Sequence, residues 1–296
     1  MSMGNEVARP GREGKIVTVG EVVWDVFPDR RVLGGAPVNV AYHLHSLGID
    51  VSVITRIGCD PLAEETLKHL GDLGLPLEGV QRDATLPTGR VNVTISDNEP
   101  SFDIVAPAAW DAIDYAPAGD LLGDQPFSLV FGTLAQRDPR SREAICRLRQ
   151  QAVARFYDVN LRPPFTTPEL VLASLVDADL VKVNGDELLQ VGRWAAISAD
   201  SKKMVAQQLL KKYNVAVLAV TEGESGAWLM VGDQLYEHPG FPAKVADTVG
   251  AGDAFFATLI DGYLHQYPWG ECLERANRRG SYVAGQHGAT PPMPSS

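Results

Sequence analysis

The sequence contains few cysteines, and they show no paired spacing. Cys59, Cys146 and Cys272 are odd in number and far apart in a chain of 296 residues. A disulfide framework or a cysteine zinc site is therefore not expected, and buried free thiols are the simpler interpretation.

The sequence also lacks an apolar run long enough for a signal peptide or a membrane-spanning helix. We therefore expect a cytoplasmic protein with no membrane partner.

Positive charge is scarce as well, because 26 lysines and arginines stand against 37 aspartates and glutamates, a formal net charge of −11. This balance argues against a nucleic acid partner. An anionic ligand would have to be held locally, by backbone amides and a metal ion.

Two familiar phosphate-binding patterns are missing. The chain contains neither G-x-x-x-x-G-K-[ST] nor G-x-G-x-x-G. A Walker-type nucleotide loop and a dinucleotide fingerprint are therefore excluded. Internal repeats do not stand out either, and a hydrophobic content of 45% is typical of a globular protein.

What the sequence does contain is an alternation of short apolar runs with amphipathic segments. Strands are predicted at 15–20, 51–58, 127–132, 154–160, 179–184 and 214–220, and helices at 37–48, 61–74, 139–151, 167–176, 199–213, about 251–265 and after 270. The alternation predicts an α/β fold with a mostly parallel sheet and helices on both faces. It is interrupted at 86–106 and 226–239, where each segment indicates a hairpin.

The stretch "DTVGAGDAFFATLIDGYL" at 247–264 is the strongest candidate for chemistry. Its apolar residues recur at helical spacing from about Ala251 onward. With no bulky side chain at Gly250, Ala251 or Gly252, backbone amides at the start of that helix can close on an anion such as a transferring phosphoryl group. Asp253 would lie beside this anion, where its carboxylate can accept the proton of an attacking alcohol.

A simpler role for Asp253 is open on the spacing alone. Acidic residues in the first turn of a helix commonly complement the helix dipole. Loops of small residues before helices are also frequent, so these residues alone do not decide between a catalytic base and a helix cap.

Two motifs together resemble those of the ribokinase-like (PfkB) carbohydrate kinases. "DTVGAGDAF" resembles the C-terminal signature of that family and "GGAPVNVAYHLHSLG" at 34–48 its N-terminal one, in the expected order. The resemblance covers about 15–291 and implies one ribokinase-like domain over 1–296, a three-layer α/β/α fold. A small β-sheet lid would be formed by about 22–33 and 86–106. It also implies that Asp253 is the catalytic base and that Gly250, Ala251 and Gly252 form the anion hole.

The same resemblance assigns the sugar site. Asp25 in "GEVVWDVFP" would bind sugar hydroxyls, and Gly34, Gly35 and Asn39 would contact the sugar. A carboxylate suits a polyol because it accepts two hydroxyl protons, and paired glycines let the chain pass close to a ring. Taken alone, Asp25 would be interpreted as a solvated loop acid and the glycines as a tight turn.

The resemblance further implies a nucleotide site with its ions. In this interpretation Glu187 in "VNGDE" binds Mg²⁺ through water, and Asp247 with the carbonyl of Val249 and the "GQHGAT" loop forms a possible K⁺ site. The nucleotide would be bound by Asn184, Thr221, Gly223, Gly226 and Asn277. An ordinary helix cap and a hairpin turn are alternative explanations of the first two motifs, "VNGDE" and "TEGESGA".

Two features are left open or discounted. Arg162 in "DVNLRPPF" would meet either a phosphate or the sugar. His43 and His45 are not expected to bind a metal together, because residues two apart on a helix point to different faces.

The expected activity is ATP-dependent phosphorylation of a neutral sugar, with fructose as the expected substrate and fructose 6-phosphate as the product. The stretches expected to form the sugar pocket contain almost no cation, with Arg30, Arg31 and Arg90 assigned to the lid surface. Fructokinases are also more similar here than ribokinases, since Ala36 stands where the latter tend to have lysine. Phe102 and Trp110 could cover the sugar ring, although a core position would explain either.

Other activities remain alternatives. They are phosphorylation of ribose, 2-keto-3-deoxygluconate, a nucleoside or a phosphosugar, or a sugar sensor without catalysis on the same fold. A homodimer through the lids is expected, because exposed strand edges can be covered by a second copy.

Overall fold

The computed structural model describes residues 14–96 and 99–294 and contains two sheets, one large and one small. The large sheet has the strand order β13-β12-β11-β10-β9-β8-β1-β4-β5. Its strands are β1 (Lys15–Val19), β4 (Val51–Ile57), β5 (Val80–Arg82), β8 (Phe127–Gly132), β9 (Ala154–Asp158), β10 (Leu180–Asn184), β11 (Val217–Thr221), β12 (Ala227–Val231) and β13 (Gln234–His238). Seven neighbouring strands of this sheet pair in parallel, namely β11, β10, β9, β8, β1, β4 and β5 in that order. The remaining two, β12 and β13, add an antiparallel hairpin beside β11.

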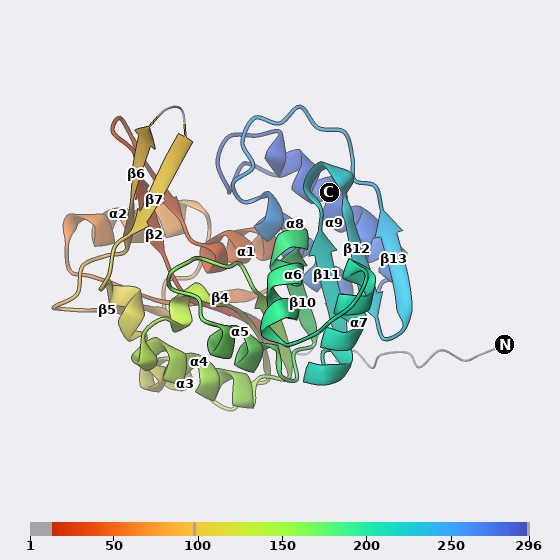
Figure 1. Cartoon of the computed structure of the whole chain (residues 1–296). Coiled ribbons are helices and arrows are strands. Elements are labelled where there is room, and N and C mark those ends of the chain that lie inside the picture. Colours follow the sequence, from red (N-terminus) through yellow and green to blue (C-terminus); the bar gives the residue numbers. More distant parts are fainter. Residues whose placement is uncertain (1–13, 97–98, 295–296) are drawn as a thin grey trace.

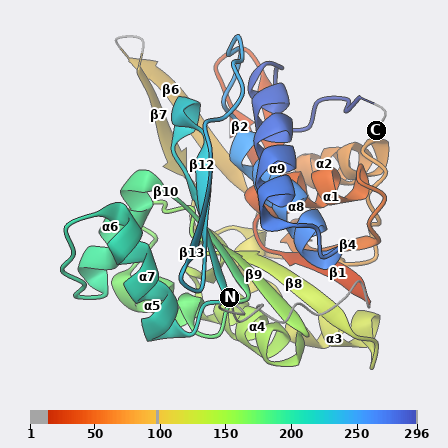
Figure 2. The same ribbon diagram turned by 90° about the vertical axis from the view of Figure 1, so that its right-hand side faces the viewer.

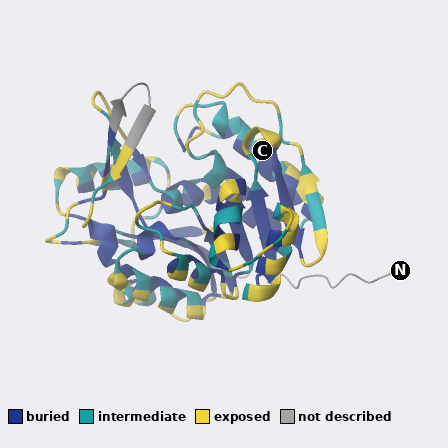
Figure 3. Ribbon diagram, viewed as in Figure 1, coloured by how far each residue is buried: buried dark blue, intermediate teal, exposed yellow. Residues whose placement is uncertain are grey.

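Helices cover both faces of this sheet (Figure 2). One face carries α1 (Ala36–His45), α2 (Pro61–Asp72), α8 (Ala251–Leu264) and α9 (Trp269–Ala284). The other carries α3 (Tyr115–Leu122), α4 (Pro139–Gln151), α5 (Pro168–Leu175), α6 (Gly185–Trp194) and α7 (Lys202–Tyr213). The central strands β1, β4, β8, β10 and β11 are almost fully buried between these layers, as the dark blue in Figure 3 shows, which explains why they are mainly apolar runs in the sequence.

The small sheet rises beside the large one, at the upper left of Figure 1. Its strand order is β3-β2-β6-β7, from β2 (Val23–Val26), β3 (Arg31–Gly34), β6 (Arg90–Ser96) and β7 (Glu99–Ile104). Strands β2 and β6 pair in parallel at its centre, so β3 and β7 form its two edges. The sheet therefore joins two segments that are far apart in the sequence.

The predicted three-layer α/β/α fold with a mostly parallel sheet is confirmed. Both predicted hairpins are present, although the turn expected within 96–100 includes residues 97–98, which lie outside the described residues. The start of the chain, residues 1–13, also lies outside the described residues, and this is the segment in which no signal peptide was expected. The division into one domain with a lid stays a prediction. In the part of the chain that the structure describes, no helix is both long and apolar enough to cross a bilayer.

Candidate active site

The parallel strands bring polar side chains together at their carboxyl ends. Glu21 follows β1, Asp158 ends β9, and Asn184 and Thr221 end the neighbouring strands β10 and β11, where the two residues pair in register. In open α/β sheets ligands bind at this edge. Helix α6 begins directly after β10, and helix α8 follows the β12–β13 hairpin along the chain.

Helix α8 begins with a bare N-terminus. Its N-cap residue Gly250 has φ +79°, ψ −9°, in the left-handed region, and no side chain caps the helix. A Cβ on Gly250 would lie 2.5 Å from the Cα of Ala289, so glycine is required both by conformation and by close packing. The predicted anion hole at Gly250, Ala251 and Gly252 thus occupies the start of a helix, where the dipole favours an anion.

Asp253 lies in the first turn of α8 and is held by a residue of α1. The Nδ2 atom of Asn39 donates a hydrogen bond of 2.8 Å to Oδ2 of Asp253, although the two residues are 214 positions apart. Burial raises the pKa of the Asp253 carboxyl, and the positive charge of Lys182 opposes this shift. Asn39 is itself buried, and its Oδ1 has no hydrogen-bond partner. The structure therefore joins a predicted base to a predicted sugar-binding residue.

Asp25 and the paired glycines also lie together. Asp25 is on β2, and a Cβ on Gly34 would lie 3.4 Å from its Oδ2. Gly35 has φ +117°, and a Cβ there would lie 2.5 Å from the carbonyl oxygen of Glu21. Burial raises the pKa of Asp25 to about 6, against the nearby charge of Arg162. The segment thus passes close to the carboxyl group of Asp25 and to the backbone of Glu21, and a carboxylate beside a glycine segment suits a polyol.

Arg162 is an exposed residue whose charge acts on several carboxyls. Its Nη1 donates a hydrogen bond of 2.9 Å to the carbonyl of Leu161. Its charge lowers the pKa values of the carboxyls at Glu21, Asp25, Asp158 and Asp253. We call these four residues the carboxylate cluster. The charge of Arg162 therefore acts on both the predicted sugar residue and the predicted base.

Glu21 was not predicted from the sequence motifs. It is 4% exposed, and its Oε2 has no hydrogen-bond partner. Burial raises its pKa to about 7, and the charges of Asp253 and Asp158 add to the shift, while Arg162 opposes it. The one available signal was an acidic residue directly after the glycine that ends a buried strand.

Asp158 and Lys182 form a buried ion pair that the motifs did not predict either. They face each other in register on β9 and β10, with Nζ of Lys182 3.1 Å from both Oδ1 and Oδ2 of Asp158. Burial raises the pKa of Asp158, and the charge of Lys182 counteracts it. A lysine in the middle of the otherwise apolar strand β10 was the available signal.

Asn184 and Glu187 form a capping box at the start of α6. Oδ1 of Asn184 accepts the amide of Glu187 at 2.8 Å, and Oε2 of Glu187 accepts the amide of Asn184 at 2.8 Å. Oε1 of Glu187 accepts the amide of Leu161 at 2.8 Å. The helix cap, which the sequence offered as an alternative to a magnesium-binding role for this motif, is therefore present. A carboxylate oxygen retains a further lone pair, so water-mediated contact with Mg²⁺ fits this donor set and stays a prediction.

The remaining predicted nucleotide residues are more dispersed. Thr221 ends β11, and Gly223 and Gly226 follow it with φ +59° and +85°. A Cβ on Gly226 would collide with the carbonyl oxygen of His238, so this turn packs closely against the end of β13, at the open end of the β12–β13 hairpin. Asn277 is buried within α9, where its Nδ2 donates to the carbonyl of Leu273 at 2.8 Å. Nucleotide contact by these four residues stays a prediction.

The predicted monovalent-cation site has its elements in contact. Oδ1 of Asp247 accepts the amide of Val249 at 3.0 Å, and Oδ2 accepts the amide of Gly288 at 3.2 Å. Asp247 thereby ties the "GQHGAT" loop to the start of α8, and a carboxylate with loop carbonyls suits a hard cation. Among residues 14–96 and 99–294, no group of three or more His, Cys, Asp or Glu side chains could hold a metal ion.

The discounted histidines lie in different environments. His43 is fully buried, its Nε2 lies 2.9 Å from the carbonyl of Ala289, and burial lowers its pKa to about 4. His45 is exposed. His43 therefore anchors the loop that packs against Gly250.

The structure also places the residues considered for ring cover and lid charge. Trp110 is fully buried, with the guanidinium of Arg137 3.9 Å from its ring centroid. It therefore has the core position that the sequence offered as the alternative to covering the sugar ring. Phe102 is 60% exposed on β7. The three arginines assigned to the lid surface are all exposed, namely Arg30, Arg31 and Arg90.

Comparison with known proteins connects this geometry to a family. The model of the pfkB family of carbohydrate kinases matches residues 13–296. Curated relatives include a fructokinase of Vibrio alginolyticus, 27% identical over 302 residues that cover 95% of this chain and 96% of the relative. They also include an aminoimidazole riboside kinase of Salmonella typhimurium, 26% identical over 301 residues that cover 95% of this chain and 92% of the relative.

Solved structures share the fold. A fructokinase with bound ATP from Xylella fastidiosa superposes with a TM-score of 0.84 at 22% identity, covering 93% of this chain and 94% of the other. A double-mutant fructokinase from Vibrio cholerae, with fructose, ADP and potassium ion bound, gives 0.78 at 21% identity, covering 94% and 95%. At these identities the likeness establishes the fold but not the substrate.

Proposed function

This chain belongs to the pfkB family of carbohydrate kinases, and from that premise we propose that it transfers the γ-phosphoryl group of ATP to a primary hydroxyl of fructose, giving fructose 6-phosphate. The observation that carries the proposal is the contact between Asn39 and Asp253. It joins the segment proposed to bind the sugar to the residue proposed to activate its hydroxyl.

In this proposal Asp253 takes the proton of the attacking hydroxyl as that oxygen bonds to phosphorus. The bond to the leaving ADP oxygen breaks, and the amides of Gly250, Ala251 and Gly252 stabilise the charge on the transferred group. Burial favours this role, because a carboxylate with a raised pKa is a stronger base. Asp25, Gly34 and Gly35 orient the sugar, with Asn39 between sugar and base.

The nucleotide is proposed to lie over the ends of β10 and β11. Its contacts come from Asn184, Thr221, Gly223, Gly226 and Asn277. Glu187 would hold Mg²⁺ through water, and Asp247 with the carbonyl of Val249 would hold K⁺. Bound Mg²⁺ would supply charge neutralisation on the triphosphate. The potassium ion bound to the Vibrio cholerae fructokinase makes K⁺ a reasonable choice for the second ion.

The small sheet is proposed to act as a lid. Asp25 lies on its strand β2, so movement of this sheet would carry a sugar contact toward the site. A closed lid excludes water, which otherwise competes with the sugar as phosphoryl acceptor. Its edge strands β3 and β7 also leave backbone groups for pairing, and we propose that two copies form a homodimer there. A solution mass of one chain at micromolar concentration would contradict this assembly.

Charge favours a neutral sugar over an anionic one. An anionic substrate needs an uncompensated cation in the pocket, because a buried unpaired charge is costly. Two cations act on the carboxylate cluster, Lys182 and Arg162. Lys182 is already paired with Asp158, and the charge of Arg162 acts on four carboxyl residues. Among the residues that the structure describes, the carboxylate cluster therefore has no surplus positive charge beside it for a phosphosugar or a sugar acid.

The test is a panel of acceptors at equal concentration with Mg-ATP. The panel contains fructose, ribose, glucose, adenosine, aminoimidazole riboside, 2-keto-3-deoxygluconate and fructose 6-phosphate. We expect fructose to give the highest kcat/KM, with Asp253→Asn as the matched control against contaminating kinases. A higher value for another acceptor would refute fructose, and turnover of either anionic sugar would refute the charge argument. Sugar binding without any ATP consumption would indicate a sensor.

A further inference from the structure

Lys182 occupies an unusual position beneath the start of α8. Its side chain extends from the buried strand β10, and the residue is only 8% exposed. A Cβ added to Gly252 would lie 3.2 Å from its Nζ and 3.5 Å from its Cε. The lysine therefore fills the space that the missing side chain of Gly252 leaves, directly against the proposed anion hole.

The charge of Lys182 is fixed by its partner. Both carboxylate oxygens of Asp158 lie 3.1 Å from Nζ, in a bidentate arrangement that holds the ammonium in place. Burial acts to lower the pKa of Lys182 and is the largest single influence on it, but the surrounding carboxylates, with Asp158 first among them, together outweigh burial and raise the pKa. The charges of Asp253 and Glu187 add to this effect. Lys182 thus stays charged among three carboxyl residues that the proposed reaction uses or borders.

A buried ion pair does not by itself stabilise a folded protein. Taking two charges out of water costs several kcal/mol per ion, and an apolar pair of similar volume is often as stable. The sheet does not need the pair of Asp158 and Lys182 in order to form, since the flanking strands β8 and β11 consist mainly of apolar residues and contain no charged one. A function at this site would explain why a charged pair occupies two core strands.

We propose that Lys182, anchored by Asp158, is a positioning residue for phosphoryl transfer: it supports the first turn of α8 beneath Gly252 and provides the positive charge that keeps Asp253 available as a base. This inference rests on the proposed function. It adds a residue to that reaction, since Lys182 acts through Asp253 and Gly252 and needs no contact with the sugar.

Several other groups face Asp253. Asn39 approaches from α1, Arg162 from the segment after β9, Glu21 from the end of β1 and Asp158 from β9. Of the two cations, Lys182 is the one that opposes the raised pKa of Asp253 more strongly. Removal of the Lys182 charge should therefore change the pH at which the acidic limb of the kcat/KM profile lies.

The test compares two substitutions with opposite expected signs. In Lys182→Met the loss of positive charge should lower kcat about tenfold or more and move the acidic limb of the kcat/KM profile upward by about one pH unit. In Asp158→Asn a negative charge is lost while the charges of Asp253 and Glu187 still favour the ammonium form of Lys182, so the acidic limb should move downward. Lys203→Met, which breaks the exposed pair with Glu237, is the control and should leave the profile unchanged.

Several outcomes would overturn the proposal. Folded Lys182→Met and Asp158→Asn variants that keep the wild-type acidic limb would make the pair merely structural. If either single variant does not fold, the double variant decides, because it leaves no unpaired buried charge; wild-type kcat in the double variant would overturn the role of Lys182. A wild-type chain that phosphorylates no acceptor of the panel would instead contradict the proposed function.

Discussion

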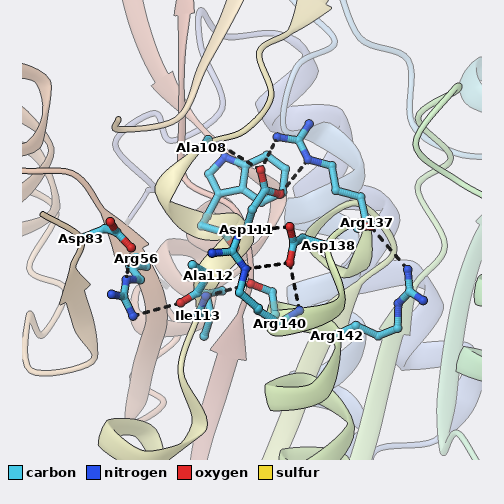
Figure 4. Close-up of polar contacts among 12 residues, drawn as sticks. Arg56, Asp83, Ala108, Asp111, Ala112, Ile113, Arg137, Asp138, Arg140 and Arg142 are labelled. Atoms are coloured by element: carbon cyan, nitrogen blue, oxygen red, sulfur yellow. Dashed lines mark hydrogen bonds and ion pairs between the residues drawn. The ribbon is translucent and has the colours of Figure 1, made fainter. Parts of the chain in front are cut away.

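Two groups of charged residues in this molecule, each only partly buried, have opposite properties. The first is the carboxylate cluster at the carboxyl ends of the parallel strands. The second, drawn in Figure 4, is an arginine network of six residues, Arg56, Asp83, Asp111, Arg137, Asp138 and Arg140. In the first group burial raises the pKa of every carboxyl. In the second, two pKa values are lowered: hydrogen bonds and Arg56 outweigh burial at Asp83, whose pKa falls to about 2, and the hydrogen bond from Arg140 lowers the pKa of Asp138.

The difference lies in how many partners each charge has. Asp111 accepts two hydrogen bonds from Arg137, of 2.7 and 2.8 Å, and another of 2.9 Å from the amide of Ala108. Asp83 accepts the amides of Thr85 and Leu86 and pairs with Arg56. The carboxylate cluster contains an orphan oxygen on Glu21, whereas the buried atoms without a hydrogen-bond partner in the arginine network are nitrogens, Nε of Arg56 and Nη1 of Arg137. Arg162 acts on all four members of the cluster. The hydrogen-bonding capacity of a carboxylate with several partners is satisfied by the fold itself, whereas underpaired buried carboxyls are typical of a site prepared for a ligand.

The largest expected effect tests the carboxylate cluster. We expect Asp253→Asn to retain sugar and nucleotide binding while kcat falls by roughly two to four orders of magnitude, the usual contribution of a positioned general base. The amide preserves the shape of the side chain but cannot accept the proton. Steady-state kinetics with direct binding measurements would check this. Near-normal turnover by the folded variant would leave Asp253 as a helix-capping residue only.

The next effect tests the arginine network. We expect Arg137→Met to lower the free energy of unfolding by about 3–5 kcal/mol, because Asp111 would remain buried without its cation. Turnover per folded molecule should stay close to that of the wild type. Chemical denaturation and active-site titration would measure the two quantities separately. A large loss of turnover without loss of stability would show that this network serves the reaction.

The sequence predicted the layers of the fold and the two motifs more completely than the contacts between them. Periodicity is local, so β8 and α4 were predicted with their observed bounds. The helix α3, which contains Pro117 and Gly119, and the three-residue edge strand β5 escaped prediction because their local signals are weak. The strand predicted from 214 begins later because Asn214 adopts a left-handed conformation at the end of α7.

In the site, too, local sequence patterns predicted individual residues but not the contacts between them. Asp25, Asn39 and Asp253 were found through family motifs, yet nothing local predicts the hydrogen bond that joins Asn39 to Asp253. The pair of Asp158 and Lys182 depends on the register of two parallel strands, which the sequence pattern does not specify. Residues whose role arises from neighbours distant in the sequence are therefore the ones that the structure adds.

The smallest expected effect concerns Glu21 and the pH dependence of stability. Its pKa rises from 4.5 to about 7 on folding. Between these values the unfolded chain loses the proton while the folded chain keeps it, so this group lowers stability progressively as the pH rises. Glu21→Gln has no ionisable group, so relative to the wild type it should gain stability on the order of 1–3 kcal/mol over this range.

Urea unfolding of both proteins at about pH 4.5 and about pH 8 would measure the gain from Glu21→Gln. Asp83→Asn is the matched control from the arginine network. Its folded pKa is lowered from 3.8 to about 2, so the stability that its carboxylate contributes is present above 3.8 and is lost only as the pH falls toward 2. The control should therefore lose the same stability at both pH values, whereas Glu21→Gln should gain more at the higher one. Equal differences at both pH values for Glu21→Gln would mean that Glu21 is ionised in the folded protein, and the contrast between the two groups of charges would not extend to this residue.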